Sequence, residues 1–332
     1  MQYRTLGRTG LRISEVSLGG LYTSSLGGGV PAAREMVDRA VKLGINFIDT
    51  APRYADSEAT LGQVLPAVKA PLILSTKLGG RPDPFDPQNR DQLMWSVEES
   101  LKLLKRDVID LLLIHEPDRP RLFKWWTDPF KVVGPVLDVM QELKEDGVIR
   151  FTGLGGTTTC QMAHLVRSRQ FDVVLTAFNY TLLFRDAEQD LLPACAETNV
   201  GVIVGSVFNQ GGLGRRFDEI VRAKPVWMAK PRQQQFLALY DYLDELDMEL
   251  PELALRWVLT NPAIHTVLIG PKNAEQVEQS VVAASHGPLG PDVMGRLDEI
   301  FKMCPMRPFE EPMILPFRWE YFGPGMANHG EV

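Results

Sequence analysis

Short apolar runs alternate with amphipathic stretches along most of the chain. The runs at residues 16–18, 47–49, 72–77, 109–115, 149–154, 173–177, 202–206 and 266–269 have the length and composition of buried strands. Apolar residues three and four positions apart predict helices at 32–43, 58–68, 91–105, 133–145, 161–169, 187–198, 233–246, 253–259, 275–284 and 291–303. The almost continuous apolar character of runs such as 109–115 is typical of parallel strands covered by helices.

Eight strand–helix units predict an α/β fold, a (β/α)8 TIM barrel, as a single domain over residues 1–332. Residues 1–14 predict an N-terminal β-hairpin, because Gly7-Arg8-Thr9-Gly10 supplies a turn between two short extended pieces. Residues 304–332 are rich in Pro, Gly and aromatic residues and show no clear hydrophobic period, so we predict that they form a C-terminal tail. The alternative, a doubly wound sheet, predicts an early G-x-G-x-x-G between a strand and a helix. Gly27-Gly28-Gly29 do not occupy such a place, which disfavours that alternative.

Composition and charge narrow the class of protein. Hydrophobic residues make up 45% and charged residues 23% of 332 residues, which excludes a disordered chain. The net charge of −7 disfavours a nucleic-acid partner, and no apolar run reaches the length of a membrane span. Residues 1–5 lack the apolar core of a signal peptide, so a cytoplasmic location is expected. Cys160, Cys195 and Cys304 are scattered and form no C-x-x-C pair, so we expect reduced thiols and no metal site.

Polar side chains end several of the predicted strands, and these are the candidates for chemistry. Asp49 ends the second strand, Lys77 the third and His115 the fourth, while Tyr54 lies in the loop after Asp49. A barrel collects its chemistry at the carboxyl ends of the strands, and successive strands are neighbours there. Taken singly, a His at a strand end is often a core residue and an Asp there is often a helix cap. Four such groups on consecutive strand ends favour a joint role instead.

The four residue types suit proton transfer to an oxygen that gains negative charge. A nearby Lys ammonium favours the phenolate of Tyr54, so we expect Lys77 to lower the pKa of Tyr54 from its reference value of about 10. Asp49 can hold and orient Lys77, and a neutral His115 can hydrogen-bond a substrate carbonyl oxygen. This is the demand of hydride transfer to and from a carbonyl. Since no side chain supplies a hydride, a nicotinamide cofactor is implied.

The chain resembles the aldo-keto reductase family over residues 3–284. Its opening, Leu6-Gly7-Arg8-Thr9-Gly10, is similar to the family's first hairpin, and the segment from Phe47 to Gly62 is similar to its most characteristic stretch. The third and fourth strand ends, Leu74 to Lys77 and Asp110 to Pro117, also match. The family uses a tetrad of Asp, Tyr, Lys and His, and the resemblance implies that Asp49, Tyr54, Lys77 and His115 form it. Within the family the chain is most similar to sugar dehydrogenases of the aldose and galactose dehydrogenase kind.

The positions that would hold the nicotinamide depart from the family's pattern. Gly155-Gly156 stand where members usually carry a Ser-Asn pair, Ala177 replaces a Gln, and Ser206 replaces an aromatic residue that stacks on the ring. The resemblance still places Gly155, Gly156 and Ser206 beside the cofactor. Backbone groups, Thr157 or Phe208 are the alternatives for the missing contacts.

The other end of the cofactor is predicted at the last strand. Residues 269–273 close that strand and open a helix, which is the usual phosphate corner of a barrel. Lys272 can meet a 2′-phosphate there and favours NADP(H) over NAD(H), although a solvated turn lysine is the alternative. Residues 211–216 resemble the family's loop over the pyrophosphate. The other positions that we expect beside the cofactor are Gly20, Leu21, Gly212, Leu213, Gly270, Gln276 and Ser280.

The substrate is expected to be a small carbonyl compound or a sugar. Tyr22 and the pair Trp125 and Trp126 are predicted to line its pocket, because aromatic faces stack on sugar rings. For the Trp pair the alternative is a loop that anchors itself on the barrel. Aromatic residues of the tail, among them Phe317 and Trp319, are expected to close the pocket or to serve a subunit contact.

The favoured hypothesis is an NAD(P)(H)-dependent oxidoreductase, which either reduces a carbonyl or oxidises a sugar hemiacetal to a lactone. One alternative is a non-catalytic, nucleotide-sensing regulatory subunit of the same fold, which the altered nicotinamide positions leave open. A less favoured alternative is a barrel glycosidase that uses a carboxylate pair such as Asp49 and Glu116. That hypothesis gives no role to Tyr54 and Lys77.

Overall fold

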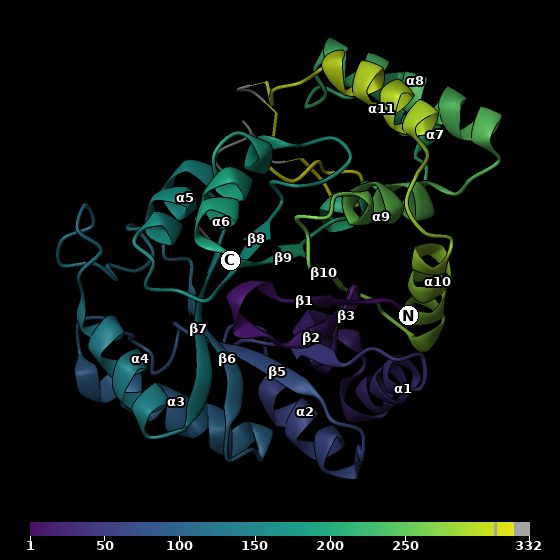
Figure 1. The fold of residues 1–332 in the computed structure, drawn as a ribbon. Helices are drawn as coiled ribbons and strands as arrows, with labels where there is room; N and C mark the ends of the chain where they lie inside the picture. The colour runs from purple at the N-terminus through teal and green to yellow at the C-terminus, as the bar shows by residue number, and fades with distance from the viewer. Residues whose placement is uncertain (309–310, 322–332) are drawn as a thin grey trace.

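Eight parallel strands close into a barrel at the centre of the computed structural model, which describes residues 1–308 and 311–321 (Figure 1). The strands pair around the barrel in the order β10-β3-β4-β5-β6-β7-β8-β9. Their bounds are β3 Val16–Gly19, β4 Phe47–Asp49, β5 Ile73–Leu78, β6 Ile109–His115, β7 Ile149–Gly156, β8 Val173–Ala177, β9 Gly201–Gly205 and β10 Thr266–Ile269. The (β/α)8 barrel is confirmed, and all eight strands lie within two residues of their predicted positions.

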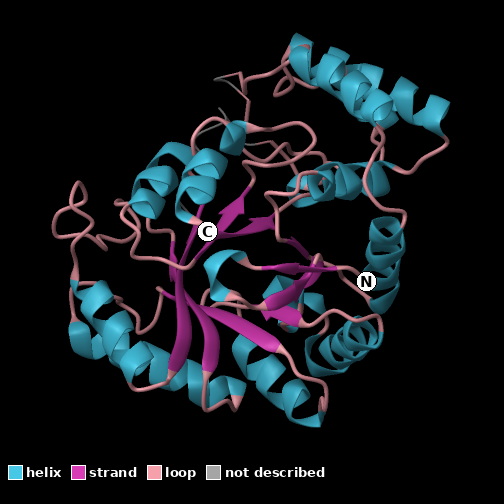
Figure 2. Cartoon of the chain, viewed as in Figure 1, coloured by secondary structure: helices cyan, strands magenta, loops and turns pink. Residues whose placement is uncertain are grey.

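Helices surround the barrel on its outer side (Figure 2). They are α1 Gly29–Lys42, α2 Ser57–Val64, α3 Arg90–Leu104, α4 Pro135–Glu145, α5 Thr159–Arg167, α6 Leu191–Thr198, α7 Asp218–Ala223, α8 Lys230–Leu246, α9 Leu250–Thr260, α10 Ala274–Ser285 and α11 Pro291–Lys302. The helix expected over 58–68 ends at Val64 and continues as the 3-10 turn Leu65–Ala67, because Pro66 has no N–H for a helical bond. The short helix α7 was not predicted, since its only fully buried side chain, Val221, gives no period.

The N-terminal hairpin covers the amino-terminal end of the barrel. Strands β1 (Tyr3–Thr5) and β2 (Arg12–Ser14) pair antiparallel, and they lie across the barrel in Figure 1. Leu6 and Ile13 are fully buried and pack into the same apolar cluster as Leu111 and Ile203 from the barrel strands. The hairpin therefore closes this end of the barrel.

Alternation along each strand decides which side chains face the barrel interior. Leu111 and Leu113 of β6 belong to the inner cluster, whereas Leu112 and Ile114 pack outwards among the helices. The same period of two directs His115 inwards at the end of β6. Each of the neighbouring strands β4 and β5 likewise carries inward polar side chains at its carboxyl end, as described below.

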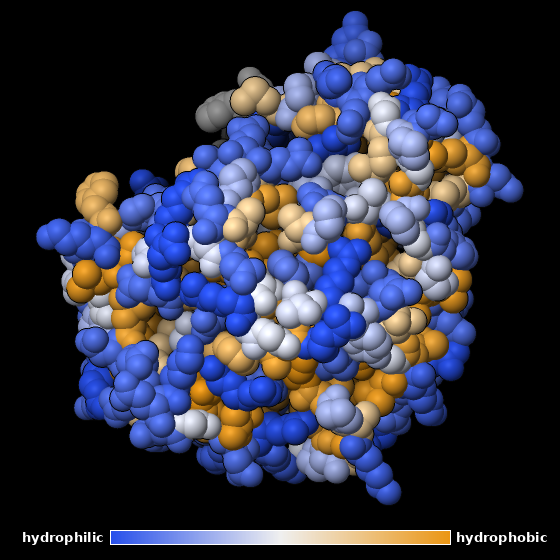
Figure 3. Space-filling view, in the orientation of Figure 1, coloured by the Kyte–Doolittle hydropathy of each residue, from blue (hydrophilic) through white to orange (hydrophobic). Residues whose placement is uncertain are grey.

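Strands β3 and β10 form the seam at which the barrel closes. Val16 pairs with Val267 and Leu18 with Ile269, and the buried hydroxyls of Ser17 and Thr266 are 2.7 Å apart across the seam. On the face seen in Figure 3, hydrophilic residues cover most of the outer helices and apolar residues lie between them. No helix in the described ranges is long and apolar enough to cross a membrane.

The described part of the C-terminal tail, residues 304–308 and 311–321, packs back onto the barrel domain. Glu311 is buried and accepts a hydrogen bond of 3.1 Å from Nε of the equally buried Arg232 in α8. Phe317 stacks on Phe217 with ring centroids 4.6 Å apart and meets the edges of Trp227 and Phe236. The remaining residues of the predicted 304–332 tail lie outside the described ranges.

Candidate active site

Asp49 and Lys77 form a buried ion pair at the carboxyl ends of β4 and β5. Lys77 Nζ donates to Asp49 Oδ2 at 2.6 Å and to the carbonyl of Thr50 at 2.8 Å, and each side chain of the pair is only 1% exposed. The hydroxyl of Ser75 donates to Asp49 Oδ1 at 2.5 Å. Ser75 and Lys77 point the same way because they are two residues apart on β5. The carboxylate is thus held from both sides and fixes the ammonium.

Tyr54 and His115 complete the cluster. Tyr54 lies in tight turns after β4, where its amide donates to Ala51 O and its carbonyl accepts from Ser57 N. Lys77 Nζ lies 4.6 Å from the centroid of the Tyr54 ring. The rings of Tyr54 and His115 meet edge-on with centroids 5.9 Å apart. The structure therefore brings together all four residues that the sequence analysis singled out.

The electrostatics of the pair keep Lys77 charged. Burial by itself lowers the pKa of Lys77, but the carboxylate of Asp49 and the Tyr54 hydroxyl outweigh burial and raise that pKa above its usual value. A charged Lys77 is then available at every pH near neutrality.

Tyr54 behaves differently from the expectation that its pKa would be lowered. Burial raises the pKa of Tyr54 and outweighs Lys77, which pulls it down by its charge and a hydrogen bond. The sequence analysis identified the effect of Lys77 correctly but gave the wrong net direction, because residue order does not reveal how much water is excluded from the phenol. Tyr54 is therefore protonated at neutral pH.

His115 is neutral at the same pH. Burial lowers its pKa well below 6.5, and the positive charges of Lys77 and Arg53 lower it further. Its carbonyl accepts the indole N–H of Trp125 at 3.0 Å. Within the described residues, Nδ1 of His115 is buried and has no hydrogen-bond partner.

Trp125 and Trp126 anchor the loop that follows β6. Trp125 is fully buried, and besides its bond to His115 it packs against Phe85 and Phe123. Trp126 donates from its indole to the carbonyl of Pro117 at 2.9 Å. A fully buried Trp125 has no face left for a sugar ring. The geometry thus supports the anchoring alternative for Trp125 over its predicted place in the substrate pocket.

Gly155 and Gly156 end β7 beside this cluster. A Cβ atom on Gly155 would lie 3.5 Å from Cε of Lys77, so this position borders the ion pair. A Cβ atom on Gly156 would lie 2.5 Å from Oδ1 of Asp118, so a side chain here requires Asp118 to shift. Asp118 Oδ2 accepts the amides of Thr157 and Thr158 at 2.9 and 2.5 Å, at the start of α5. The sequence analysis did not single out Asp118, although an acid follows Pro117 after a buried strand.

Gly20, Leu21 and Tyr22 form a 3-10 turn after β3. A Cβ atom on Gly20 would lie 2.5 Å from the carbonyl oxygen of Asp49, so the close approach of β3 and β4 requires glycine here. Tyr22 lies under the β10 loop, where the ammonium of Lys272 is 5.1 Å from its ring centroid and Gly270 is in contact. These predicted cofactor and substrate positions therefore gather at the mouths of β3 and β10.

The side chains of Gln276 and Ser280 hydrogen-bond to backbone groups at the start of helix α10. Asn273 caps the helix by accepting the amide of Gln276 at 2.9 Å, and the side chain of Gln276 accepts the amide of Lys272 at 2.9 Å. The hydroxyl of Ser280 donates to the carbonyl of Gln276 at 2.8 Å. The ammonium of Lys272 is exposed and has no carboxylate partner among residues 1–308 and 311–321.

Residues 206–216, which we call the glycine loop, follow β9. Within it Gly211 and Leu213 donate their amides to Phe208 O, at 2.9 and 3.0 Å. The amides of Gly212 and Gly214 also bond inside the loop, to the carbonyls of residues 209 and 211. Ser206 adopts a left-handed backbone conformation with φ 57°. These four amides of the glycine loop therefore donate hydrogen bonds to carbonyls of the same loop.

The residues at the ends of β9 and β10 fit a phosphorylated cofactor. Lys272, Arg215 and Arg318 each present a cation that no carboxylate of the described chain neutralises. Arg and Lys cations of this kind form strong hydrogen bonds with phosphate groups. The described ranges hold no cluster of three or more His, Cys, Asp or Glu side chains placed to share a metal ion.

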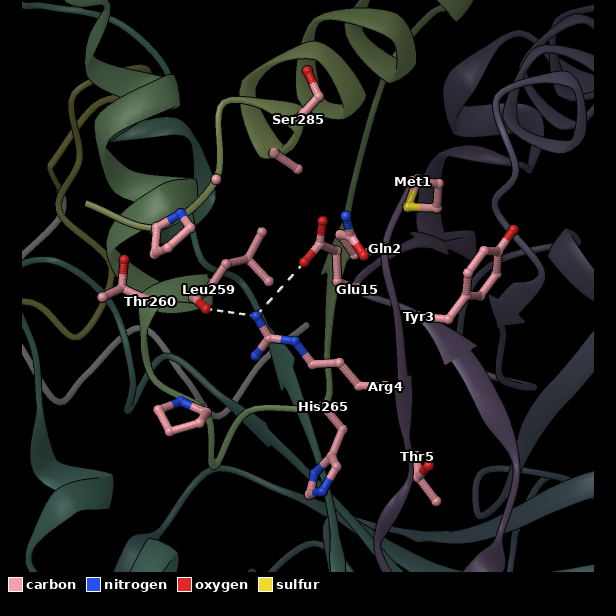
Figure 4. Close-up of a pocket in the computed structure, with 14 residues that line it drawn as sticks. Met1, Gln2, Tyr3, Arg4, Thr5, Glu15, Leu259, Thr260, His265 and Ser285 are labelled. Carbon is pink, nitrogen blue, oxygen red and sulfur yellow. Dashed lines mark hydrogen bonds and ion pairs between the residues drawn. The ribbon is translucent and has the colours of Figure 1, made fainter. Parts of the chain in front are cut away.

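A separate cavity lies beside the N-terminal hairpin (Figure 4). It has a volume of about 670 Å³ and is lined by Arg4, Glu15 and His265 among others. Arg4 donates to the carbonyls of Leu259 and Ile264 at 2.6 Å each and lies 3.6 Å from Glu15. The guanidinium is committed to these partners and fastens the hairpin. The residues that line this cavity do not include Asp49, Tyr54, Lys77 or His115.

Comparison with known proteins agrees with this geometry. The model of the Aldo/keto reductase family matches residues 22–302. The chain is 31% identical over 302 residues to L-galactose dehydrogenase of Arabidopsis thaliana, a match that covers 86% of this chain and 88% of that protein. It is 26% identical over 283 residues to D-threo-aldose 1-dehydrogenase of a Pseudomonas species, covering 75% and 82% of the two chains.

A solved structure has the same architecture. The holo form of aldo-keto reductase AKR11C1 from Bacillus halodurans superposes with a TM-score of 0.75 and is 26% identical in sequence. The similarity covers 92% of this chain and 97% of that one, so it extends over the whole barrel.

Proposed function

Because the chain belongs to the aldo/keto reductase family and is therefore an oxidoreductase that acts on small molecules, we propose that it transfers a hydride between a nicotinamide cofactor and the carbonyl or alcohol carbon of a sugar or small aldehyde. The observation that carries the proposal is the buried Lys77 ammonium, which Asp49 holds at 2.6 Å against the ring of Tyr54. A charge pair this deep is costly to bury, and a role in proton transfer explains its place.

Tyr54 is the acid and base of the proposed reaction. In reduction its protonated hydroxyl gives a proton to the substrate oxygen as negative charge develops there. Lys77 then stabilises the phenolate that remains, since its ammonium lies beside the ring. In oxidation the same phenolate takes the proton from the substrate hydroxyl. A bound nicotinamide supplies or accepts the hydride at the substrate carbon.

His115 orients the substrate oxygen. Its pKa, lowered by burial, keeps the ring neutral, so His115 cannot be the proton donor and Tyr54 is left in that role. Because Nδ1 has no hydrogen-bond partner in the part of the chain that the structure describes, we place the single ring proton on Nε2, where it can donate to the substrate oxygen. A buried lone pair on Nδ1 without a partner costs less free energy than a buried N–H group without a partner.

The finer assignments rest on the surroundings of this cluster. Lys272, at the start of α10, has no carboxylate partner among the described residues, which supports NADP(H) over NAD(H) through a 2′-phosphate. A sugar is supported by the names of the two dehydrogenase relatives. It is supported also by the polar set of Glu116, Arg119 and Thr157 beside the cluster, in which Arg119 Nε lies 2.9 Å from Glu116 Oε2. Such groups suit the hydroxyls of a polyol.

The test uses purified protein, NADPH or NADH carrying deuterium at the transferred position, and a panel of sugars and aldehydes. We expect deuterium on the product carbon, and Tyr54→Phe is expected to lower kcat about 10²- to 10⁴-fold while leaving the Kd of the dinucleotide unchanged. More than half of the wild-type kcat in that variant would remove Tyr54 from its role. Dinucleotide binding without turnover would support a nucleotide-sensing subunit instead, and no binding at all would favour the glycosidase alternative.

A further inference from the structure

We propose that Arg318 of the C-terminal tail binds the pyrophosphate of the dinucleotide, together with Arg215 of the glycine loop. This inference rests on the proposed function, because it assumes that a dinucleotide lies along β9 and β10. It assigns the tail a task beyond the two that the sequence suggested, which were closing a substrate pocket and contacting a subunit.

The tail is seated directly on the glycine loop. A Cβ atom on Gly211 would lie 2.8 Å from Nη1 of Arg318 and 3.2 Å from its Cδ, so the guanidinium lies on the bare backbone of Gly211. The neighbouring Gly212 faces the ring of Phe317, whose Cδ2 would be 3.3 Å from a Cβ there. Two residues of the tail thus cover two glycines of the loop.

The loop itself has few groups left to neutralise a phosphate. The amides of Gly211, Gly212, Leu213 and Gly214 all donate to carbonyls within the loop. Arg216 is engaged by the carboxylates of Asp218 and Asp244. An anion over this loop therefore needs side-chain cations from elsewhere, and Arg215 is the single cation that the loop can spare.

A stacked aromatic pair joins the segment that carries Arg215 to the segment that carries Arg318. The guanidinium of Arg215 lies 4.8 Å from the ring centroid of Phe217, and Phe217 stacks on Phe317 at 4.6 Å. Arg318 follows Phe317 in sequence and is exposed, with no ion-pair partner among the described residues. Both exposed guanidinium groups therefore adjoin the same stacked pair beside the glycine loop, and no carboxylate of the described residues pairs with either. A pyrophosphate supplies two negative phosphates in that place, and Arg binds phosphate through paired N–H donors.

Isothermal titration calorimetry on the full chain measures the Kd of three probes, which are NADP⁺, NAD⁺ and ADP-ribose. ADP-ribose keeps the pyrophosphate and lacks the nicotinamide. We expect Arg318→Met to weaken every probe that the wild type binds by about fivefold to tenfold, the loss of one charge-assisted contact. Arg318→Lys keeps the positive charge and should recover most of the affinity that Arg318→Met loses. The matched control is Arg296→Met, which removes an exposed guanidinium from α11 that pairs with Glu299 instead.

A second variant tests whether the tail positions Arg318. Phe317→Ala should weaken the probes to the same extent, and the double variant with Arg318→Met should be no worse than either alone. Unchanged affinities in Arg318→Met, a loss equal to that of Arg296→Met, or a loss for the dinucleotides without one for ADP-ribose would each overturn the inference. A wild-type protein that binds none of the probes would refute the proposed function itself, a result that cannot be confused with the others.

Discussion

Asp49→Asn should destabilise the protein strongly at pH 7 and much less at pH 9. The substitution preserves the shape of the side chain and its contact with Ser75, but it removes the charge that faces Lys77 at 2.6 Å. Both side chains are 1% exposed, so the ammonium that remains has no water to replace its partner. The variant isolates the electrostatic part of the site from its packing.

The expected magnitude follows from the distance and the burial. At an effective dielectric constant of about 20, two charges this close attract by about 6 kcal/mol. Removing one partner of a buried pair typically costs about 3–5 kcal/mol. The loss is also limited by the alternative of deprotonating Lys77, which at pH 7 costs about 5 kcal/mol from a reference pKa of about 10.4. We therefore expect a loss of about 3–5 kcal/mol in the free energy of unfolding at pH 7.

The pH dependence has a definite sign. In the wild type the raised pKa of Lys77 contributes stability that is present below the unfolded value and is lost as pH rises through the folded value. In Asp49→Asn burial is unopposed, so the folded pKa of Lys77 falls below the unfolded value and stability rises with pH. Neutralising the lysine costs only about 2 kcal/mol at pH 9, so the loss relative to wild type is smaller there than at pH 7.

Urea unfolding followed by tryptophan fluorescence at pH 7 and pH 9 measures both quantities. The control is Asp244→Asn, which removes a carboxylate that is 65% exposed and pairs with Arg216, so that a loss below about 1 kcal/mol at either pH is expected. An Asp49→Asn protein that loses less than about 1 kcal/mol at pH 7, or the same amount at both values, would show that the pair is not the buried charge pair described here.

Three further predictions concern the site and its surroundings. Lys77→Met should move the alkaline rise of the oxidative pH–rate profile to higher pH, because Lys77 lowers the pKa of the Tyr54 phenol. The rate of reduction by the wild type should stay level through the neutral range. Identical pH–rate profiles in the variant and the wild type would remove Lys77 from the mechanism. Lys272→Ala should raise the Kd of NADPH and leave that of NADH unchanged, which titration by fluorescence detects; equal effects on both would exclude a 2′-phosphate contact. Gly156→Ala should lower the free energy of unfolding by about 1–3 kcal/mol, since its Cβ would lie 2.5 Å from Asp118 Oδ1; a wild-type urea midpoint would show that Asp118 can move aside.

The barrel and the members of its cluster could be predicted from the sequence because each depends on a local pattern. The run from Ile109 to His115 is nearly all apolar and ends in one polar residue, so both the strand and its functional end are visible in the residue order. Asp49 and Lys77 end their runs in the same way. Side chains that end neighbouring parallel strands must converge, whatever the details of packing.

Properties that depend on long-range packing could not be predicted. The net direction of the Tyr54 pKa depends on how much water the surrounding loops exclude, and no residue pattern records that. The full burial of Trp125 depends on Phe85 and Phe123, which come from separate loops. Asp118 escaped notice because its partners are backbone amides of residues about forty positions later. The contact of Arg318 with Gly211 joins segments more than a hundred residues apart without any periodic signal.

The seam between β3 and β10 has a consequence for the chain as it leaves the ribosome. Val16 of β3 pairs with Val267 of β10. The edge of β3 that faces β10 therefore stays unpaired until the ribosome has synthesised β10. At about 5–20 residues per second, synthesis of the intervening segment takes roughly 10–50 seconds. During that interval β3 presents a row of unpaired backbone groups, the kind of edge on which another nascent chain can add a strand. The hydroxyl contact between Ser17 and Thr266 forms only after β10 has been synthesised, so the seam cannot become native before that point of translation.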